Sequence, residues 1–140
     1  MAVSNQILVV VKGLILNEGK VLLVKRSNEE EVGGGTWELV GGKIEFGEDL
    51  KPGLLREIKE EVNLNVTIER ILYTTTFLTD PTRQVILLTY LCLSQTKTVA
   101  LSSEHSDYHW ATKEETRLLL TPEILRDFEK SDVFTLEEFH

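Results

Sequence analysis

The pattern of apolar and polar residues along the chain predicts strands on both sides of one long helix. Runs rich in β-branched and other apolar residues predict strands over residues 7–16, 21–25, 66–78 and 84–94. Asn17-Glu18-Gly19-Lys20 joins the first two as a hairpin, because Gly19 can take the positive φ of a tight turn. Thr79-Asp80-Pro81-Thr82 is the predicted turn between the last two.

In residues 49–62 the apolar positions recur with the period of an α-helix. The apolar residues that gather on one arc of a helical wheel are Leu54, Leu55, Ile58 and Val62. Asp49 is a candidate N-cap, since its side-chain oxygen can accept from a free N–H of the first turn. Pro52 falls in that turn, where its missing N–H has no helical partner to lose. Asn63 is the candidate left-handed residue that closes the helix.

Two shorter helices are predicted near the end of the sequence. One begins at Thr112, and the other is capped by Thr121 and packs Ile124, Leu125 and Phe128 onto the sheet. The order of hairpin, loop, helix, strands and helices indicates an α/β fold, with a mixed sheet and helices on its faces. A length of 140 residues lies within the roughly 100–200 residues of one domain, so we expect a single domain over residues 1–140.

Composition excludes several classes of protein. The net charge of −8 argues against binding a nucleic-acid polymer, whose backbone is also negative. No apolar run approaches the roughly 18 residues of a membrane span, and no basic residue precedes the run at 7–11 as in a secretory signal. The lone Cys92 excludes an intramolecular disulfide and favours a reducing, cytoplasmic compartment. We therefore expect a cytoplasmic protein that binds no membrane.

Three glutamates gather on a second arc of the long helix. Glu57, Glu60 and Glu61 lie at spacings that place them side by side, where like charges cost roughly 0.2–0.5 kcal/mol per pair. Only Glu60 has a helical partner, Arg56, four residues before it. A divalent cation such as Mg²⁺ would relieve the repulsion, since hard cations take oxygen ligands. The alternative is an acidic helix face that is simply solvated.

The segment that contains these glutamates has a specific spacing. It reads Gly42, five residues, Glu48, seven residues, Arg56-Glu57-Ile58-Lys59-Glu60-Glu61, one residue, Asn63 and Leu64. This resembles the signature box of the Nudix hydrolases, which cleave nucleoside diphosphates linked to another group. Every fixed polar position matches. The resemblance implies an α/β/α Nudix sandwich with the box as loop and helix.

The sequence departs from the family pattern at two positions and has one oddity inside the helix. Asn63 stands where the family has Gly, and because Asn tolerates positive φ we expect a small stability cost and intact chemistry. Val40 stands where the family usually has Pro. Gly53 lies inside the helix, where it costs about 1 kcal/mol relative to Ala.

The resemblance assigns roles to individual residues of the box. Metal would be held by Glu57, Glu60, Glu61 and the carbonyl of Gly41, with Mg²⁺ as the expected ion and Mn²⁺ as the alternative. Glu48 would pair with Arg56 and, with Gly42, keep the loop in register with the helix. The catalytic candidates are Arg56, Glu57 and Glu104, with either Glu57 or Glu104 as the general base and Glu57 preferred.

The substrate is less well defined by the sequence. Arg26 and Lys43 are candidate contacts for phosphate, and Trp37 is expected in the core rather than stacked on a base. Residues 37–45 look like the corresponding segment of MutT-type enzymes, which makes a nucleoside triphosphate the first choice among small-molecule nucleotides. The alternatives are an ADP-sugar or dinucleoside polyphosphate hydrolase, and a Nudix-fold module that binds nucleotide without cleaving it. The oligomeric state is not determined, which leaves a homodimer open.

Two histidines lie close to Glu104 in the sequence. His105 and His109 are interpreted as loop or strand residues, because two histidines without cysteine partners make a poor zinc set.

Overall fold

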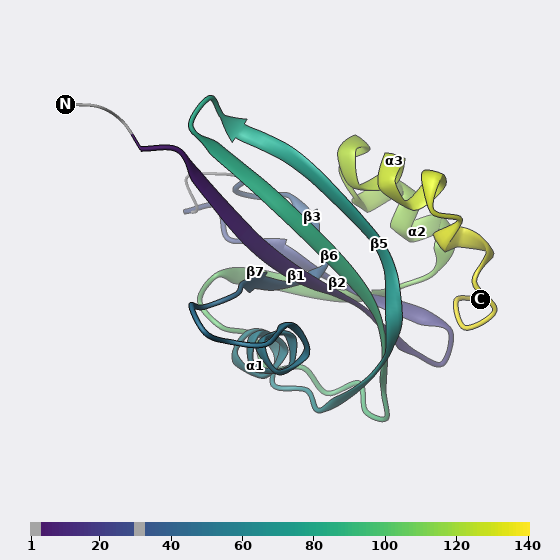
Figure 1. Cartoon of the computed structure of the whole chain (residues 1–140). Helices are drawn as coiled ribbons and strands as arrows, with labels where there is room; N and C mark the ends of the chain where they lie inside the picture. Colours follow the sequence, from purple (N-terminus) through teal and green to yellow (C-terminus); the bar gives the residue numbers. More distant parts are fainter. Residues whose placement is uncertain (1–3, 30–32) are drawn as a thin grey trace.

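The computed structural model describes residues 4–29 and 33–140. The Glu- and Gly-rich stretch 27–36 is predicted from its sequence to be a surface loop, and part of it lies outside the described residues. Figure 1 shows the course of the chain. The strands are β1 (Gln6–Asn17), β2 (Lys20–Arg26), β3 (Trp37–Glu38), β4 (Val40–Lys43), β5 (Val66–Asp80), β6 (Arg83–Ser94) and β7 (His105–Ala111). The helices are α1 (Leu50–Val62), α2 (Lys113–Leu119), α3 (Pro122–Lys130) and a short 3₁₀ helix, η1 (Val133–Thr135).

The described strands form one mixed sheet. The hydrogen-bonded order is β3-β2-β1-β6-β5, and in addition β4 pairs with β1 and β7 pairs with β2. β1 and β6 are parallel from Gln6 opposite Arg83 to Leu16 opposite Leu93, whereas the other pairs are antiparallel. The other edge of β1 is shared between β4 and β2.

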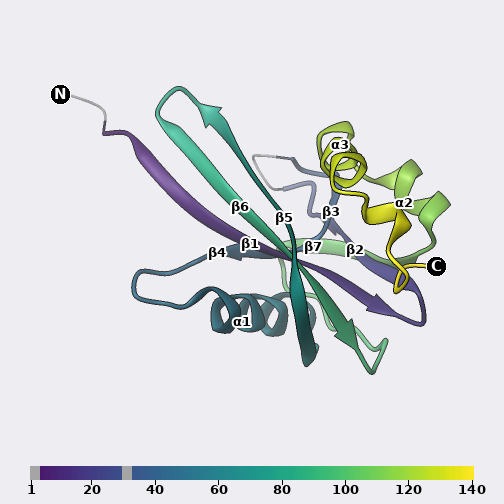
Figure 2. The ribbon, with the colours of Figure 1, turned by 45° about the vertical axis from the view of Figure 1, so that its right-hand side comes forward.

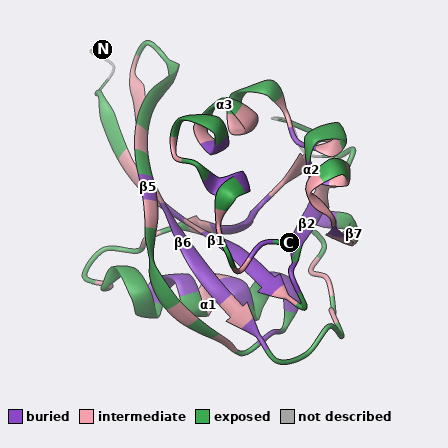
Figure 3. Ribbon diagram, turned by 90° about the vertical axis from the view of Figure 1, so that its right-hand side faces the viewer, coloured by how far each residue is buried: buried purple, intermediate pink, exposed green. Residues whose placement is uncertain are grey.

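Helices cover both faces of this sheet, as the α/β prediction required. Side chains of a strand alternate between the two faces. Val11 and Ile15 of β1 therefore pack with α1, while Leu14 and Leu16 pack with the C-terminal helices. Figure 2 shows α1 on one side and α2 and α3 on the other, and Figure 3 shows the buried central strands between them. The fold is an α/β/α sandwich.

The helix boundaries agree with the sequence, but two caps do not. α1 ends at Val62, and Asn63 adopts the predicted left-handed conformation with φ 57° and ψ 39°. Thr112 caps α2 through a reciprocal capping box with Glu115. Asp49 and Thr121 occupy the predicted N-cap positions with the extended backbone usual there, but the expected hydrogen bond from the side chain to the first turn is absent at both.

Gly53 is explained by what packs against α1. A Cβ at this position would lie 2.4 Å from Cδ1 of Ile44 and 2.9 Å from Oε1 of Glu48. Glycine therefore lets the loop before the helix lie directly against it, which offsets its poor helix propensity. The loop that carries Glu48 is thereby held against the helix that carries the other box residues.

The remaining elements follow the prediction with small shifts. In the first hairpin Glu18 and Gly19 both have positive φ, at 50° and 80°. The second turn is shorter than predicted, because β5 continues to Asp80. Cys92 is fully buried, and burial raises the pKa of its thiol to about 12. No helix among the described residues is long and apolar enough to cross a membrane.

Candidate active site

A cleft of about 1190 Å³ lies where the ends of several strands meet α1 and α3. It is lined by residues from both halves of the chain, among them Lys12, Glu38, Phe77, Arg83 and Ile124. Six of the residues singled out from the sequence also line it: Arg26, Gly41, Gly42, Lys43, Glu57 and Glu104. A concave site that gathers charged groups from distant segments is the usual form of a ligand site.

Arg56 ties the loop of the box to its helix, as predicted. Its Nε donates to Oε2 of Glu48 at 2.7 Å, and its Nη2 donates to Oε1 of Glu48 at 2.9 Å and to the carbonyl of Lys43 at 3.2 Å. This two-point contact lowers the pKa of Glu48 to about 2. Nη1 of the same guanidinium contacts Glu57 at 3.1 Å and Glu60 at 3.2 Å.

Gly42 makes room for Glu57. A Cβ on Gly42 would lie 2.5 Å from Oε2 of Glu57, so any side chain there would displace the carboxylate. Gly41, next to it, has a φ of 152° and passes so close to β1 that a Cβ would lie 2.0 Å from the carbonyl oxygen of Val11. The two glycines thus let the chain pass between β1 and the Glu57 side chain.

Glu61 lies deeper than the other glutamates of α1. Burial raises the pKa of Glu61, and the neighbouring Glu57 and Glu104 raise it further, whereas Lys12 opposes them. Its Oε2 is buried and has no hydrogen-bond partner among the described residues. Glu60, by contrast, is exposed and contacts Arg56.

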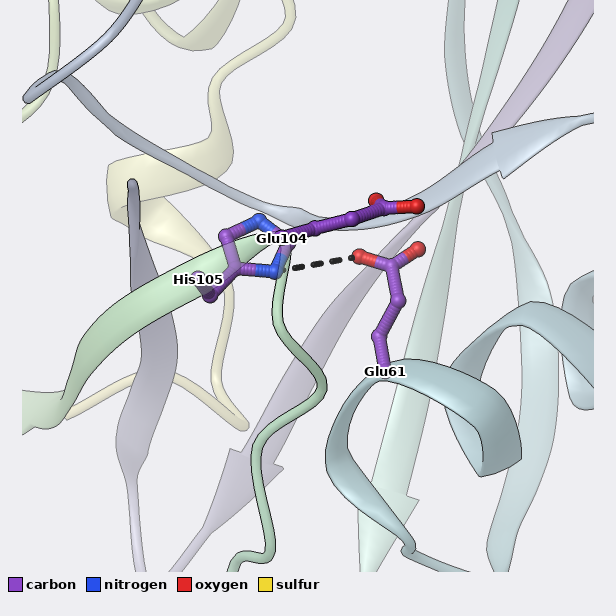
Figure 4. A group of neighbouring side chains, drawn as sticks. All are labelled: Glu61, Glu104 and His105. Carbon is purple, nitrogen blue, oxygen red and sulfur yellow. Dashed lines mark ion pairs between the residues drawn. The ribbon is translucent and has the colours of Figure 1, made fainter. Parts of the chain in front are cut away.

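Backbone contacts bring Glu104 to this helix. The N–H of Ser102 donates to the carbonyl of Glu61 at 3.0 Å, and the N–H of Ala100 donates to that of Val62 at 3.1 Å. The segment before β7 is therefore fixed on the C-terminal end of α1, where helix carbonyls lack intrahelical partners. One ligand atom from each of Glu61, Glu104 and His105 lies within 4.8 Å of the others, and Figure 4 shows these side chains converging.

His105 and Glu38 are parts of the site that the sequence reasoning missed. His105 is buried, with its Nε2 2.9 Å from Oε2 of Glu38. Burial by itself would raise the pKa of Glu38, but Lys12, the hydrogen bond to His105, and Arg26 together lower it to about 2. The available signal for Glu38 was that it is the one charged residue in the otherwise apolar stretch 37–40, just before Gly41. Nothing in the sequence distinguished His105 from His109.

Two of the other residues considered from the sequence also lie at the cleft. Arg26 contacts Glu38 at 3.2 Å, so its guanidinium is anchored at the cleft wall. Trp37 is half-buried, packs against the core and also lines the cleft. His109, four residues after His105, is half-exposed and contacts Glu115 at 2.8 Å.

The residues at this place fit a divalent cation. Glu57, Glu61 and Glu104 bring three carboxylates together, and burial, followed by the repulsion of Glu57 and Glu104, raises the pKa of Glu61. The buried Oε2 of Glu61 has no protein donor among the described residues, which is the situation that a bound cation would resolve. Oxygen ligands of this kind suit Mg²⁺ and Mn²⁺.

Comparison with known proteins agrees with the fold and the motif. The family model of the NUDIX domain matches residues 7–131. The nucleoside triphosphatase NudI of Escherichia coli O139:H28 is 33% identical over 113 residues, which cover 73% of this chain and 79% of that protein. The chain therefore belongs to the Nudix hydrolase family. It is a pyrophosphohydrolase of nucleoside phosphate derivatives.

Solved structures place the fold in the same family. The crystal structure of the MutT protein from Methanosarcina mazei Go1 matches with a TM-score of 0.83 and 30% identity, covering 97% of this chain and all (100%) of that one. A MutT NUDIX hydrolase from Burkholderia pseudomallei matches with a TM-score of 0.74 over 89% of this chain and 98% of that one. Its identity of 22% supports the fold alone.

Proposed function

We propose that this enzyme hydrolyses a nucleoside triphosphate to a nucleoside monophosphate and pyrophosphate, with Mg²⁺ as its ion and Mn²⁺ as the alternative. The observation that carries the proposal is the convergence of Glu57, Glu61 and Glu104 beside a large cleft, with a buried oxygen of Glu61 left without a donor among the described residues. The choice of a triphosphate is supported by the E. coli relative, which is called a nucleoside triphosphatase.

The proposed ligands of the ion are the carboxylates of Glu57, Glu60, Glu61 and Glu104, with the carbonyl of Gly41. When bound, a divalent ion neutralises charge on the phosphate oxygens and makes a water molecule easier to ionise. Such neutralisation is needed here, because the chain carries a net charge of −8 and its substrate is also an anion. Glu60 would contribute from the solvent side, since its side chain is exposed.

The chain's own residues then have separable tasks in the hydrolysis. Water attacks a phosphorus atom, its oxygen forms the new P–O bond, and the bridging P–O bond to the departing phosphate group breaks. The proton lost by the water passes to a carboxylate, for which Glu57 is our first choice and Glu104 the second. Arg56 would hold Glu57 in place, because its Nη1 lies 3.1 Å from Oε1 of Glu57 while Glu48 fixes the other side of the guanidinium.

The cleft offers a cationic part and an apolar part for the two ends of a nucleotide. Arg26 and Lys43 line it near the carboxylates and would contact phosphate oxygens. Phe77 and Ile124 line it on β5 and α3 and provide apolar surface for a nucleoside. Nε of Arg83, another lining residue, is buried without a partner among the described residues and would be available to a bound ligand.

A panel of nucleotides tests the proposal. Purified protein with Mg²⁺ would be incubated with nucleoside triphosphates, an ADP-sugar and a dinucleoside polyphosphate, and the products separated. Release of pyrophosphate with a nucleoside monophosphate from a triphosphate is the expected result. Cleavage of the ADP-sugar or dinucleoside polyphosphate alone would replace the triphosphate with those substrates. Hydrolysis that is unchanged by a chelator would contradict the proposed role of the ion.

A further inference from the structure

His105 is placed between two carboxylates on different elements. Its side chain is 1% exposed, its Nε2 lies 2.9 Å from Oε2 of Glu38, and its Nδ1 lies 3.6 Å from Oε1 of Glu61. Removing an imidazole from water is costly unless its nitrogens find partners. His105 therefore has a polar role as well as a packing role, because it bridges a strand residue and a proposed metal ligand.

The Glu38 side of this chain of contacts is firmly held. Oε1 of Glu38 accepts from Nζ of Lys12 at 3.4 Å, and Oε2 accepts from Nη1 of Arg26 at 3.2 Å in addition to His105. Lys12 is itself tied to the carbonyl of Leu39 at 3.2 Å. With two cations beside it, Glu38 is a carboxylate, which can only accept hydrogen bonds. Nε2 of His105 is consequently the donor in their contact.

The contact between His105 and Glu61 is incomplete. Nδ1 of His105 and Oε2 of Glu61 are both buried and have no hydrogen-bond partner among the described residues. Figure 4 shows Nδ1 directed at the Glu61 carboxylate. Their 3.6 Å separation is only slightly longer than a hydrogen bond, so a small rotation of the Glu61 side chain would close it.

The backbone around His105 leaves its ring little freedom. The register of β7 with β2 shifts between Lys25 and Arg26, and a bulge of this kind changes the direction of a side chain. The N–H of Ser27 donates to the carbonyl of Glu104 at 2.9 Å, which fixes the peptide just before the histidine. The adjustable partner is therefore Glu61, whose side chain projects from the last turn of α1.

We propose that His105 is a positioning residue: anchored by Glu38, it contacts Glu61 through Nδ1 and fixes the orientation in which this carboxylate meets the divalent ion. The inference rests on the proposed function of the site and assigns to it a residue outside the Nudix box. Groups that orient a metal ligand commonly change metal affinity or activity by roughly 10–100-fold when they are removed.

Two substitutions of His105 separate its two contacts. The amide nitrogen of Asn can take the place of Nδ1, and that of Gln the place of Nε2. His105→Asn therefore keeps a donor toward Glu61, whereas His105→Gln keeps the donor toward Glu38 and loses the contact with Glu61. His109→Gln is the matched control, because His109 also contacts a glutamate but is 42% exposed and lies against Glu115 of α2, away from Glu61.

The first measurement is the binding of Mn²⁺ in the absence of substrate. The electron paramagnetic resonance signal of the free ion reports how much Mn²⁺ remains unbound. We expect wild type and His109→Gln to bind alike, His105→Gln to bind about tenfold or more weakly, and His105→Asn to lie between them. In turnover assays the ion concentration for half-maximal rate should rise for His105→Gln, while KM for the nucleotide at saturating ion should change little. Wild-type affinity in His105→Gln, or equal loss in both His105 variants, would overturn the proposal.

The second measurement uses the unaltered protein, so it does not depend on whether the variants fold. Nuclear magnetic resonance of the imidazole nitrogens should show the His105 signals shifting as Mg²⁺ binds, while those of His109 stay unchanged. His105 signals that do not respond to Mg²⁺ would overturn the positioning role. If wild type binds neither ion, the proposed metal dependence fails, whereas intact wild-type binding with unaffected variants removes only the inference about His105.

Discussion

Glu60 and Glu61 are consecutive residues of one helix with the same side chain and opposite surroundings. The Glu60 side chain is 60% exposed and contacts Arg56, while that of Glu61 is 5% exposed and faces His105. A step of about 100° around a helix is enough to carry a carboxylate from solvent to the interior. The acidic face predicted from spacing therefore has two different environments. Glu60 lies where water solvates its charge, and Glu61 lies where acidic side chains are crowded together in the interior.

The first way to test this comparison is to remove charge on the inner side at Glu57. Glu57→Gln should lower kcat by roughly 10²–10⁴-fold, the range for loss of a general base, while the protein keeps its fold. Steady-state kinetics with a circular dichroism spectrum would measure both. Glu60→Gln is the comparison variant and should cost less, because its side chain is exposed. Unchanged turnover in Glu57→Gln would remove Glu57 as base and principal ligand.

The second test moves the inner carboxylate without changing it. In Gly42→Ala the new Cβ would occupy the place of Oε2 of Glu57, so the carboxylate must swing away. Displacement of a catalytic group by about 1 Å can cost roughly 10²-fold in rate, and we expect a loss of that order. The free energy of unfolding should fall by only about 1 kcal/mol, as for an average substitution, since the displaced group is the end of a flexible side chain. A variant with wild-type kcat would show that the position of Glu57 does not matter.

The third test concerns the cost of burying Glu61. In the absence of divalent ions, Glu61→Gln should raise the melting temperature by roughly 2–4 °C at neutral pH, which corresponds to about 1 kcal/mol. Burial, with Glu57 and Glu104, raises the pKa of Glu61, so folding must protonate this carboxyl, whereas the amide carries no such cost. Saturating Mg²⁺ should stabilise the wild-type protein through binding linkage and the variant much less. Thermal scans with and without the ion measure both effects. Equal stabilisation by Mg²⁺ in the two proteins would exclude Glu61 as a ligand.

The smallest expected effect comes from Glu115, whose pKa is lowered, whereas that of Glu61 is raised. The backbone hydrogen bond from Thr112, followed by the contact with His109, lowers the pKa of Glu115 to about 2 from its ordinary 4.5. A lowered pKa adds stability above pH 4.5, which is lost as the pH falls toward 2. Glu115→Gln should therefore be slightly less stable than wild type at pH 7, and the difference should shrink on acidification. Denaturant titrations at several pH values would measure it, and a gap that widens in acid would refute it.

The sequence was sufficient for those parts of the site that are local in the chain. The resemblance to the Nudix box implied the Glu48–Arg56 pair, and Asn63 ends α1 as expected, because both depend on contacts within the box. Glu38 and His105 could not be found in this way. Their contact joins two strands far apart in sequence, and only the pairing of β2 with both β3 and β7 brings them together.

The same reasoning explains the errors at the helix caps. Asp49 and Thr121 have residue types that favour capping, but a cap also needs a side-chain rotamer that points back at the first turn. Gly53 looked costly for a helix because the sequence does not show what lies against it. In the structure Ile44 and Glu48 occupy the space that a side chain would need. At Gly53 packing against Ile44 and Glu48 therefore overrules helix propensity.

The parallel pairing of β1 with β6 has a consequence for how the enzyme is made. Parallel neighbours require a long intervening chain, and contacts between such distant segments form slowly. β1 is synthesised well before β6 and must therefore wait for the chain as far as Ser94 before that edge is covered. Lys12, which anchors Glu38, lies on this strand. The nascent chain thus completes the candidate site only after β6 has been made, and a chain that stops before β6 would expose this edge of β1.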